Sequence, residues 1–192
     1  MTKIVLFGDS MLGRFTKPRI VQLESEVGDA TVFNCAAGGW TSADGAVRAA
    51  TIAKTEPDFV VLSFGANDCA PGRIVPLDDY ASNLRVIAGA FAPATLISFL
   101  PPSVVEVDGV GRAGRTNAVL DTYRRVFRDV VPLAVDTDAV LRPHAQEPVH
   151  EDGLHLTDAA YRVVISALAA VLSPGGPARS CDGTGGRPRT GA

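Results

Sequence analysis

Short, continuously apolar runs alternate with longer amphipathic segments along almost the whole of this chain. The alternation predicts an α/β fold, because parallel strands cannot be joined by tight turns and need crossover helices instead. The runs are too apolar for a sheet with one face in water, so helices should cover both faces. The predicted strands are 3–7, 31–35, 59–64, 95–100 and 133–136. The predicted helices are 20–27, 42–54, 77–91, 117–130 and 158–172, the last with Thr157 as its N-cap.

Length and composition favour one globular domain. With 192 residues, 46% of them hydrophobic and 20% charged, the chain can bury a substantial core. We place this domain at 1–173 and expect a disordered tail at 174–192, which is rich in glycine, proline and arginine.

No apolar stretch is as long as a membrane span, and a first strand at Lys3 leaves no room for a signal peptide, so we expect a cytoplasmic location. The net charge of −3 gives no reason to expect a nucleic-acid partner, and the sequence leaves the oligomeric state open.

Polar and glycine residues gather where the predicted strands end. Asp9 and Ser10 follow the first strand, segment 34–41 contains the end of the second, and segment 65–68 follows the third. In doubly wound sheets, ligands bind outside the carboxyl ends of the strands, so these groups should share one edge. The loop at 152–155 comes after the fifth strand, and right-handed crossovers can return it to the same edge.

Ser10, Asp152 and His155 form the set of residues that nucleophilic acyl transfer needs. A serine hydroxyl is a weak nucleophile near neutral pH, so it requires a base and a third group that orients the base. We assign Ser10 as the nucleophile, His155 as the base and Asp152 as the orienting carboxylate. Gly153 should ease the turn that lays the carboxylate beside the imidazole.

Three hydrogen-bond donors at the strand ends suit the oxyanion of such a reaction. They are the backbone N–H groups of Ser10 and Gly39 and the side-chain amide of Asn67. A glycine at position 39 allows the backbone itself to approach the substrate. We therefore predict an oxyanion hole made by these three residues.

The four polar segments, in this order, resemble the signature blocks of the SGNH hydrolase family, also called GDSL esterases and lipases. The blocks are Gly8-Asp9-Ser10, Asn34 with Gly39 and Thr41, Gly65-Ala66-Asn67-Asp68, and Asp152-Gly153-Leu154-His155. The resemblance spans residue 5 to about 170, with Ala36 where a glycine is common. It implies a flavodoxin-like three-layer α/β/α sandwich with five parallel strands, and hydrolysis of esters, thioesters or O-acetyl groups.

Residues near the nucleophile are candidates for a substrate pocket. Asp9 and Met11 flank Ser10, Trp40 either walls the acyl site or packs in the core, and Val104 lies in an irregular segment at 101–115. Five basic residues could bind an anionic alcohol or carrier group, although a solvated face is the interpretation we favour: Arg14, Lys17, Arg19, Arg112 and Arg115.

The remaining candidates point to no cofactor. Cys35, Cys69 and Cys181 are too widely spaced for a zinc motif, and we expect the first two to be inert. His150 with Asp152 and His155 lacks a further ligand cluster, so we predict no metal.

We predict a serine hydrolase that cleaves small-molecule esters, with short acyl or O-acetyl esters favoured, through an acyl-enzyme intermediate. An acyltransferase or thioesterase using the same three residues is the alternative. A non-catalytic flavodoxin-like binding protein is a weaker candidate, because the loop after the first strand lacks a phosphate-binding or dinucleotide-binding pattern.

Overall fold

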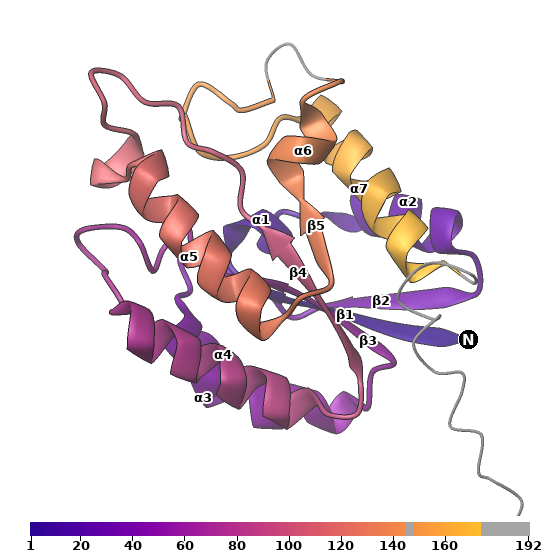
Figure 1. The fold of residues 1–192 in the computed structure, drawn as a ribbon. Coiled ribbons are helices and arrows are strands. Elements are labelled where there is room, and N and C mark those ends of the chain that lie inside the picture. Colours follow the sequence, from indigo (N-terminus) through magenta and orange to yellow (C-terminus); the bar gives the residue numbers. More distant parts are fainter. Residues whose placement is uncertain (145–147, 174–192) are drawn as a thin grey trace, which may run out of the picture.

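The computed structural model describes residues 1–144 and 148–173, and these form a three-layer α/β/α sandwich (Figure 1). The five strands are parallel and lie in the order β2-β1-β3-β4-β5, which confirms the predicted fold class. The predicted tail at 174–192 lies outside the described residues, and its disorder stays a prediction. The strand bounds are β1 Thr2–Gly8, β2 Ala30–Asn34, β3 Phe59–Ser63, β4 Thr95–Leu100 and β5 Ala134–Asp136.

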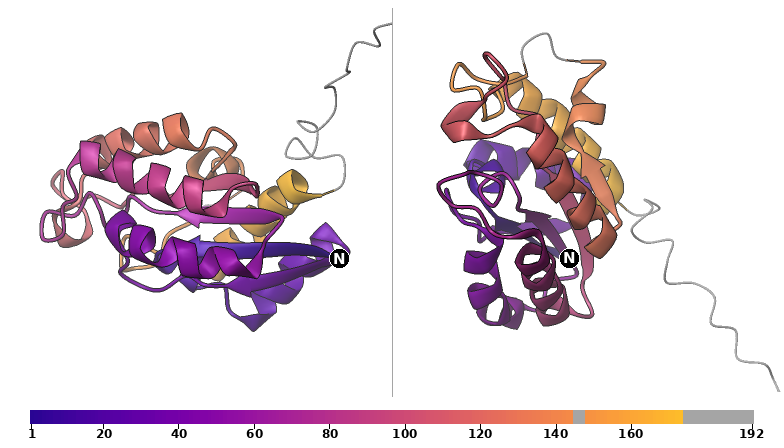
Figure 2. Two further views of the ribbon diagram at one scale, coloured as in Figure 1. Left: turned by 90° about the horizontal axis from the view of Figure 1, so that it is seen from below. Right: turned by 60° about the vertical axis from the view of Figure 1, so that its left-hand side comes forward.

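Helices cover both faces of the sheet, as the apolar strands require (Figures 1 and 2). One layer holds α3, α4 and α5, and the other holds α2 and α7 with the short α6 beside α7. The loops after the carboxyl ends of the strands gather at the end of the molecule opposite the N-terminus. The helix bounds are α1 Ser10–Gly13, α2 Lys17–Val27, α3 Ser42–Ile52, α4 Leu77–Phe91, α5 Asn117–Val130, α6 Thr137–Leu141 and α7 Asp158–Leu172.

The centre of the core is β1, which pairs with β2 on one side and β3 on the other. Four consecutive residues, Ile4 to Phe7, have no solvent exposure, and the β3 residues Val60 to Leu62 have none either. Burial of both faces explains why these runs show no alternation of polar and apolar residues. Each such side chain contributes roughly 1.5–3 kcal/mol by leaving water.

The predicted helices are confirmed with small shifts at their ends. Three of them, α4, α5 and α7, have the predicted bounds, and Thr157 caps α7 by accepting a hydrogen bond from the Ala160 N–H. Towards its N-terminus, α2 extends to Lys17, because Pro18 suits the first turn of a helix. After Ile52, α3 continues as a 3₁₀ turn, Ala53–Thr55.

Two short helices, α1 and α6, were not predicted. Each begins after an aspartate, Asp9 or Asp136, whose carboxylate accepts a backbone N–H at the start of the helix. Segments of four and five residues are too short to show a helical repeat of apolar positions, so only their capping residues signalled them.

Gly8 permits the close approach of β1 and β3 at the edge where Ser10 lies. A Cβ atom at this position would stand 2.1 Å from the Ser63 carbonyl oxygen, in a backbone with φ +153°. The neighbouring Asp9 N–H donates to the same Ser63 carbonyl at 3.0 Å. Only a residue without a side chain therefore fits there.

We expect Gly8→Ala to destabilise the protein by well over the roughly 1 kcal/mol of an average point mutation, because backbone atoms of β3 must move. Gly89→Ala is the matched control: Gly89 lies in α4 with open space around it, and alanine there should add about 0.5–1 kcal/mol of stability. Denaturant unfolding measures both. Equal unfolding free energies for the two variants would contradict the close approach of the strands.

Candidate active site

Ser10 stands at the carboxyl end of β1, as the first residue of α1. Asp9 is completely buried and fixes the turn: its Oδ1 accepts the Met11 N–H at 2.9 Å and the Ser63 hydroxyl at 3.0 Å. Burial raises the pKa of Asp9 to about 7, against the lowering effect of these two hydrogen bonds. The nucleophile candidate therefore projects from a short turn that is anchored in the core.

His155 and Asp152 reach Ser10 from a loop that follows α6 in the chain. Ser10 Oγ lies 2.9 Å from His155 Nε2, and Asp152 Oδ2 lies 2.6 Å from His155 Nδ1. Asp152 Oδ1 accepts the backbone N–H groups of Leu154 and His155 at 3.0 and 2.9 Å. These bonds close the turn, with Gly153 at φ +68°. The fold thus brings together three residues that the sequence separates by most of its length.

Electrostatics around His155 favour the neutral imidazole. Burial lowers its pKa, the Asp152 carboxylate raises it, and the cations of Arg14 and Arg112 lower it, with a net lowering from the usual value of 6.5. Burial tends to raise the pKa of Asp152, but the hydrogen bonds from His155 and Leu154 hold it well below its usual range. At neutral pH the pair is therefore an imidazole beside a carboxylate, which is the form that can accept a proton from serine.

Arg112 is a partner of the pair that sequence reasoning did not identify. Its Nη1 lies 3.0 Å from Asp152 Oδ2, the oxygen that also contacts His155. Arg112 comes from the irregular segment at 101–115, where only the general abundance of basic residues gave a signal.

The three predicted oxyanion donors line one cleft of about 870 Å³ together with His155. Asn67 is held on both sides: its Nδ2 donates to the Trp40 carbonyl at 2.9 Å, and its Oδ1 accepts from Arg115 Nη2 at 3.1 Å. One N–H of the Asn67 amide remains for a ligand. Within the described part of the chain, the backbone N–H groups of Ser10 and Gly39 have no hydrogen-bond partner.

The sequence profile of the GDSL-like lipase/acylhydrolase family matches residues 6–163, which is most of the chain and includes all three residues of the Ser–His–Asp arrangement. The chain belongs to this family. Membership makes it a GDSL-type ester hydrolase, and the five-stranded sandwich is the fold of its structural relatives.

Solved structures with this fold carry the names of esterases and lipases. A lipase/acylhydrolase from Enterococcus faecalis is 22% identical, with a TM-score of 0.79 over 88% of this chain and 94% of that one. An aryl esterase from M. smegmatis is 19% identical, with a TM-score of 0.72 over 88% and 97%. A carbohydrate acetylesterase family member from Sinorhizobium meliloti is 20% identical, with a TM-score of 0.71 over 90% and 97%. None of the curated proteins compared matches the chain significantly.

Four residues predicted for the substrate pocket of this GDSL hydrolase lie elsewhere. Asp9 and Met11 are completely buried, because the turn after β1 directs both side chains into the core. Trp40 is partly buried and packs edge-on against Phe7, with ring centroids 6.0 Å apart, which favours the core interpretation. Val104 is buried and lines a second cleft, of about 580 Å³, near His150. None of the four is among the residues that line the catalytic cleft, and Asp9 and Met11 have no exposed surface with which to contact a ligand.

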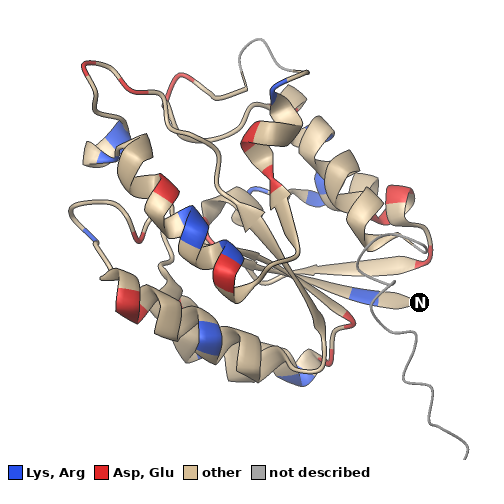
Figure 3. Ribbon diagram, viewed as in Figure 1, with Lys and Arg blue, Asp and Glu red and all other residues tan. Residues whose placement is uncertain are grey.

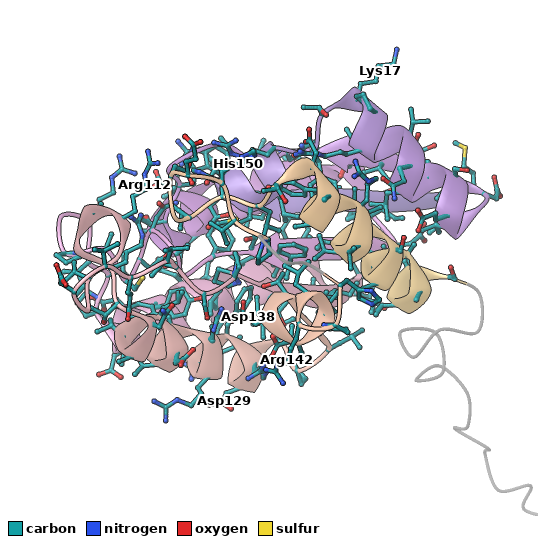
Figure 4. The ribbon with its side chains drawn as sticks, turned by 90° about the horizontal axis from the view of Figure 1, so that it is seen from above. Lys17, Arg112, Asp129, Asp138, Arg142 and His150 are labelled. Atoms are coloured by element: carbon teal, nitrogen blue, oxygen red, sulfur yellow. The ribbon has the colours of Figure 1, made fainter. Side chains whose placement is uncertain are left out.

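The basic residues divide into two groups. Arg14, Arg112 and Arg115 line the cleft, as does Arg73, which sequence reasoning did not single out. Lys17 points away from the molecule (Figure 4), and Arg19 pairs with Asp158 over the ring of Tyr161. The solvated-face interpretation is wrong for Arg115, which is only 6% exposed.

Cys69 is buried, and burial raises the pKa of its thiol to about 11, which agrees with an inert role. Cys35 is partly buried, and both thiols are free, whereas Cys181 lies outside the described residues.

In residues 1–144 and 148–173, no cluster of three or more His, Cys, Asp or Glu is placed to hold a metal ion. The same ranges include no helix long and apolar enough to cross a membrane, and the cytoplasmic location stays a prediction.

The His155 imidazole should titrate below pH 6.5 in the folded protein, because burial and the two arginines disfavour its charged form. Replacement Asp152→Asn should lower this pKa further, since the carboxylate raises it. NMR of the ring protons measures both values, with His155→Gln used to assign the resonances. A His155 pKa above 6.5 in the unaltered protein would contradict the environment described.

Proposed function

We propose that this GDSL hydrolase cleaves carboxylic esters through an acyl-enzyme intermediate on Ser10. The observation that carries the proposal is the chain of short contacts, 2.9 Å from Ser10 Oγ to His155 Nε2 and 2.6 Å from His155 Nδ1 to Asp152 Oδ2. His155 accepts the hydroxyl proton as Oγ attacks the ester carbonyl, and returns it to the leaving alcohol. Water then attacks the acyl-enzyme with the same imidazole as base.

The oxyanion that forms at each attack is stabilised by the N–H groups of Ser10 and Gly39 and by the Asn67 amide. All three line the cleft beside the nucleophile. Donors that are fixed before the reaction need no reorganisation when charge develops. The contacts of Asn67 with Trp40 and Arg115 supply that fixation.

The lining of the cleft favours short acyl or O-acetyl groups. Ala70, Ala113 and Leu154 are its apolar side chains, and the other lining residues are glycine, polar or charged. A long acyl chain needs a continuous apolar surface to leave water, which this lining does not supply. Thioester cleavage and acyl transfer to another alcohol would use the same three residues, and no contact in the site favours them over ester hydrolysis.

A fluorophosphonate probe should label Ser10, because such probes react with serines that have an activated hydroxyl. Ser10→Ala should abolish labelling and lower hydrolysis of 4-nitrophenyl acetate by about 10⁴-fold or more. Labelling is read by mass spectrometry of the intact protein and its peptides. A folded protein that neither labels nor turns over the ester would contradict catalysis, and equal labelling of Ser10→Ala would contradict the assigned nucleophile.

Asn67→Ala should reduce kcat by roughly 100- to 1000-fold with a smaller change in KM, because its amide acts on the charge of the transition state. Asn83→Ala is the matched control. That amide donates to Ser42 Oγ at 3.1 Å from α4 and does not line the cleft. Steady-state kinetics on a neutral acetate ester, with melting temperatures to confirm folding, separate the two. Similar kcat values for both variants would remove Asn67 from the oxyanion hole.

A further inference from the structure

Four arginines line the cleft that contains the nucleophile. Arg14, Arg73, Arg112 and Arg115 line it, and within the described residues no Asp or Glu does. Figure 3 shows basic residues on the 3₁₀ turn Arg112–Gly114 and on the loop before α4, and Figure 4 shows Arg112 extending outward at the loop end. Among the described residues, the one carboxylate in ion-pair contact with this group is Asp152, which pairs with Arg112 and His155.

Arg115 is buried without an ion-pair partner among the described residues, and the charge of Asp9 acts on it from beyond ion-pair distance. Its guanidinium is buried and donates to three neutral oxygens: the Ala66 carbonyl, the Arg112 carbonyl at 2.9 Å and Asn67 Oδ1 at 3.1 Å. In the part of the chain described, no carboxylate lies within ion-pair distance of it, and burial lowers its pKa. A buried cation without an ion-pair partner adds to the positive charge of the cleft, which favours a negatively charged ligand there.

The remaining cleft arginines differ in what they can still bind. Arg73 donates to the Gly39 carbonyl and so supports the oxyanion loop. Arg112 has one ion-pair contact, to Asp152. Arg14 is exposed, lies at the end of α1 beside the nucleophile, and forms no ion pair with any described residue. Arg14 therefore has its guanidinium donors available for a ligand.

Arg14 and Arg112 lie on the side of the cleft where the leaving alcohol of the ester must bind. In the proposed reaction the leaving oxygen must take its proton from His155 Nε2, so the alcohol portion of the ester lies against the imidazole. Arg14 and Arg112 line the cleft together with His155, and Arg112 Nη1 lies 3.0 Å from Asp152 Oδ2, the oxygen that contacts the imidazole. A negative group on the alcohol would lie within their reach.

We propose, on the basis of the function proposed above, that the substrates are esters whose alcohol portion carries a carboxylate or phosphate. Arg14 is the main contact of that anion, and the guanidinium fork can bind two of its oxygens at once. Arg112 adds charge while it holds Asp152. A preference for an anionic ester over a neutral one is a difference in transition-state binding, and the ratio of the two kcat/KM values measures it.

The test compares 3-acetoxybenzoate with its neutral analogue methyl 3-acetoxybenzoate at pH 8, where His155 is neutral. Each kcat/KM is divided by the rate of hydroxide hydrolysis of the same ester. We expect the anionic ester to be favoured by about tenfold, equivalent to about 1.4 kcal/mol, and the preference to fall as salt is raised. No preference, or one that salt does not change, would overturn the proposal.

Variants identify the residue responsible. Arg14→Gln should remove most of the preference and Arg14→Lys should keep part of it, because lysine retains the charge but not the fork. Arg85→Gln is the matched control: it changes the net charge equally from an exposed position on α4 outside the cleft. An unchanged preference in Arg14→Gln, or an equal loss in Arg85→Gln, would overturn the assignment to Arg14.

A second pair of esters places the charge on the acyl side: phenyl hydrogen glutarate and neutral phenyl pentanoate. A preference for the anionic ester that is confined to this pair would overturn the assignment of the anion to the alcohol portion.

Failure of this inference is distinguishable from failure of the proposed function. Hydrolysis of methyl 3-acetoxybenzoate and fluorophosphonate labelling of Ser10 depend on the catalytic residues alone, so they would persist if only the charge preference were absent.

Discussion

The burial of β1 between two strands and two layers of helices is the constraint on which the site depends. A strand with Ile4 to Phe7 wholly out of water has a fixed register and direction, so the residues that follow it leave the sheet at a fixed point. Gly8 then allows the chain to run against the Ser63 carbonyl, and Asp9 closes the turn. Ser10 is thus positioned by the core, although it stands at the surface of a cleft.

The second half of the site is built on local hydrogen bonds. The loop from Val149 to Leu156 is joined at its ends by an isolated antiparallel bridge, and Asp152 accepts two backbone N–H groups within it. One carboxylate therefore both shapes the loop and contacts the imidazole, which couples the conformation of the loop to the orientation of His155. Packing of α7, which begins directly after this loop, against α2 carries the histidine to the nucleophile.

The arginines give the cleft two linked properties. The charges of Arg14 and Arg112 disfavour the protonated form of His155, which keeps the proposed base available, and the same charges would favour the anionic esters that we propose as substrates. Asp152 opposes the first effect by stabilising the imidazolium once it forms. Asp152 and these two arginines therefore act in opposite directions on the protonation of His155.

The sequence by itself determined the sheet, the longer helices and the identity of the groups at the strand ends. Continuous apolar runs and helical spacing are local patterns, and Ser10, Gly39, Asn67, Asp152 and His155 stand in motifs that can be read without coordinates. Short helices such as α6 could not be predicted, because they contain too few residues to show a helical repeat of apolar positions.

Only the tertiary structure decided which side chains face the cleft. Asp9 and Met11 adjoin the nucleophile in sequence but turn into the core, whereas Arg73 and Arg112 come from distant loops and line the cleft. Sequence separation carries no information on such contacts, because the direction of a side chain in an irregular loop depends on what the rest of the fold packs against it. The charge of the cleft is for that reason a property of the folded chain.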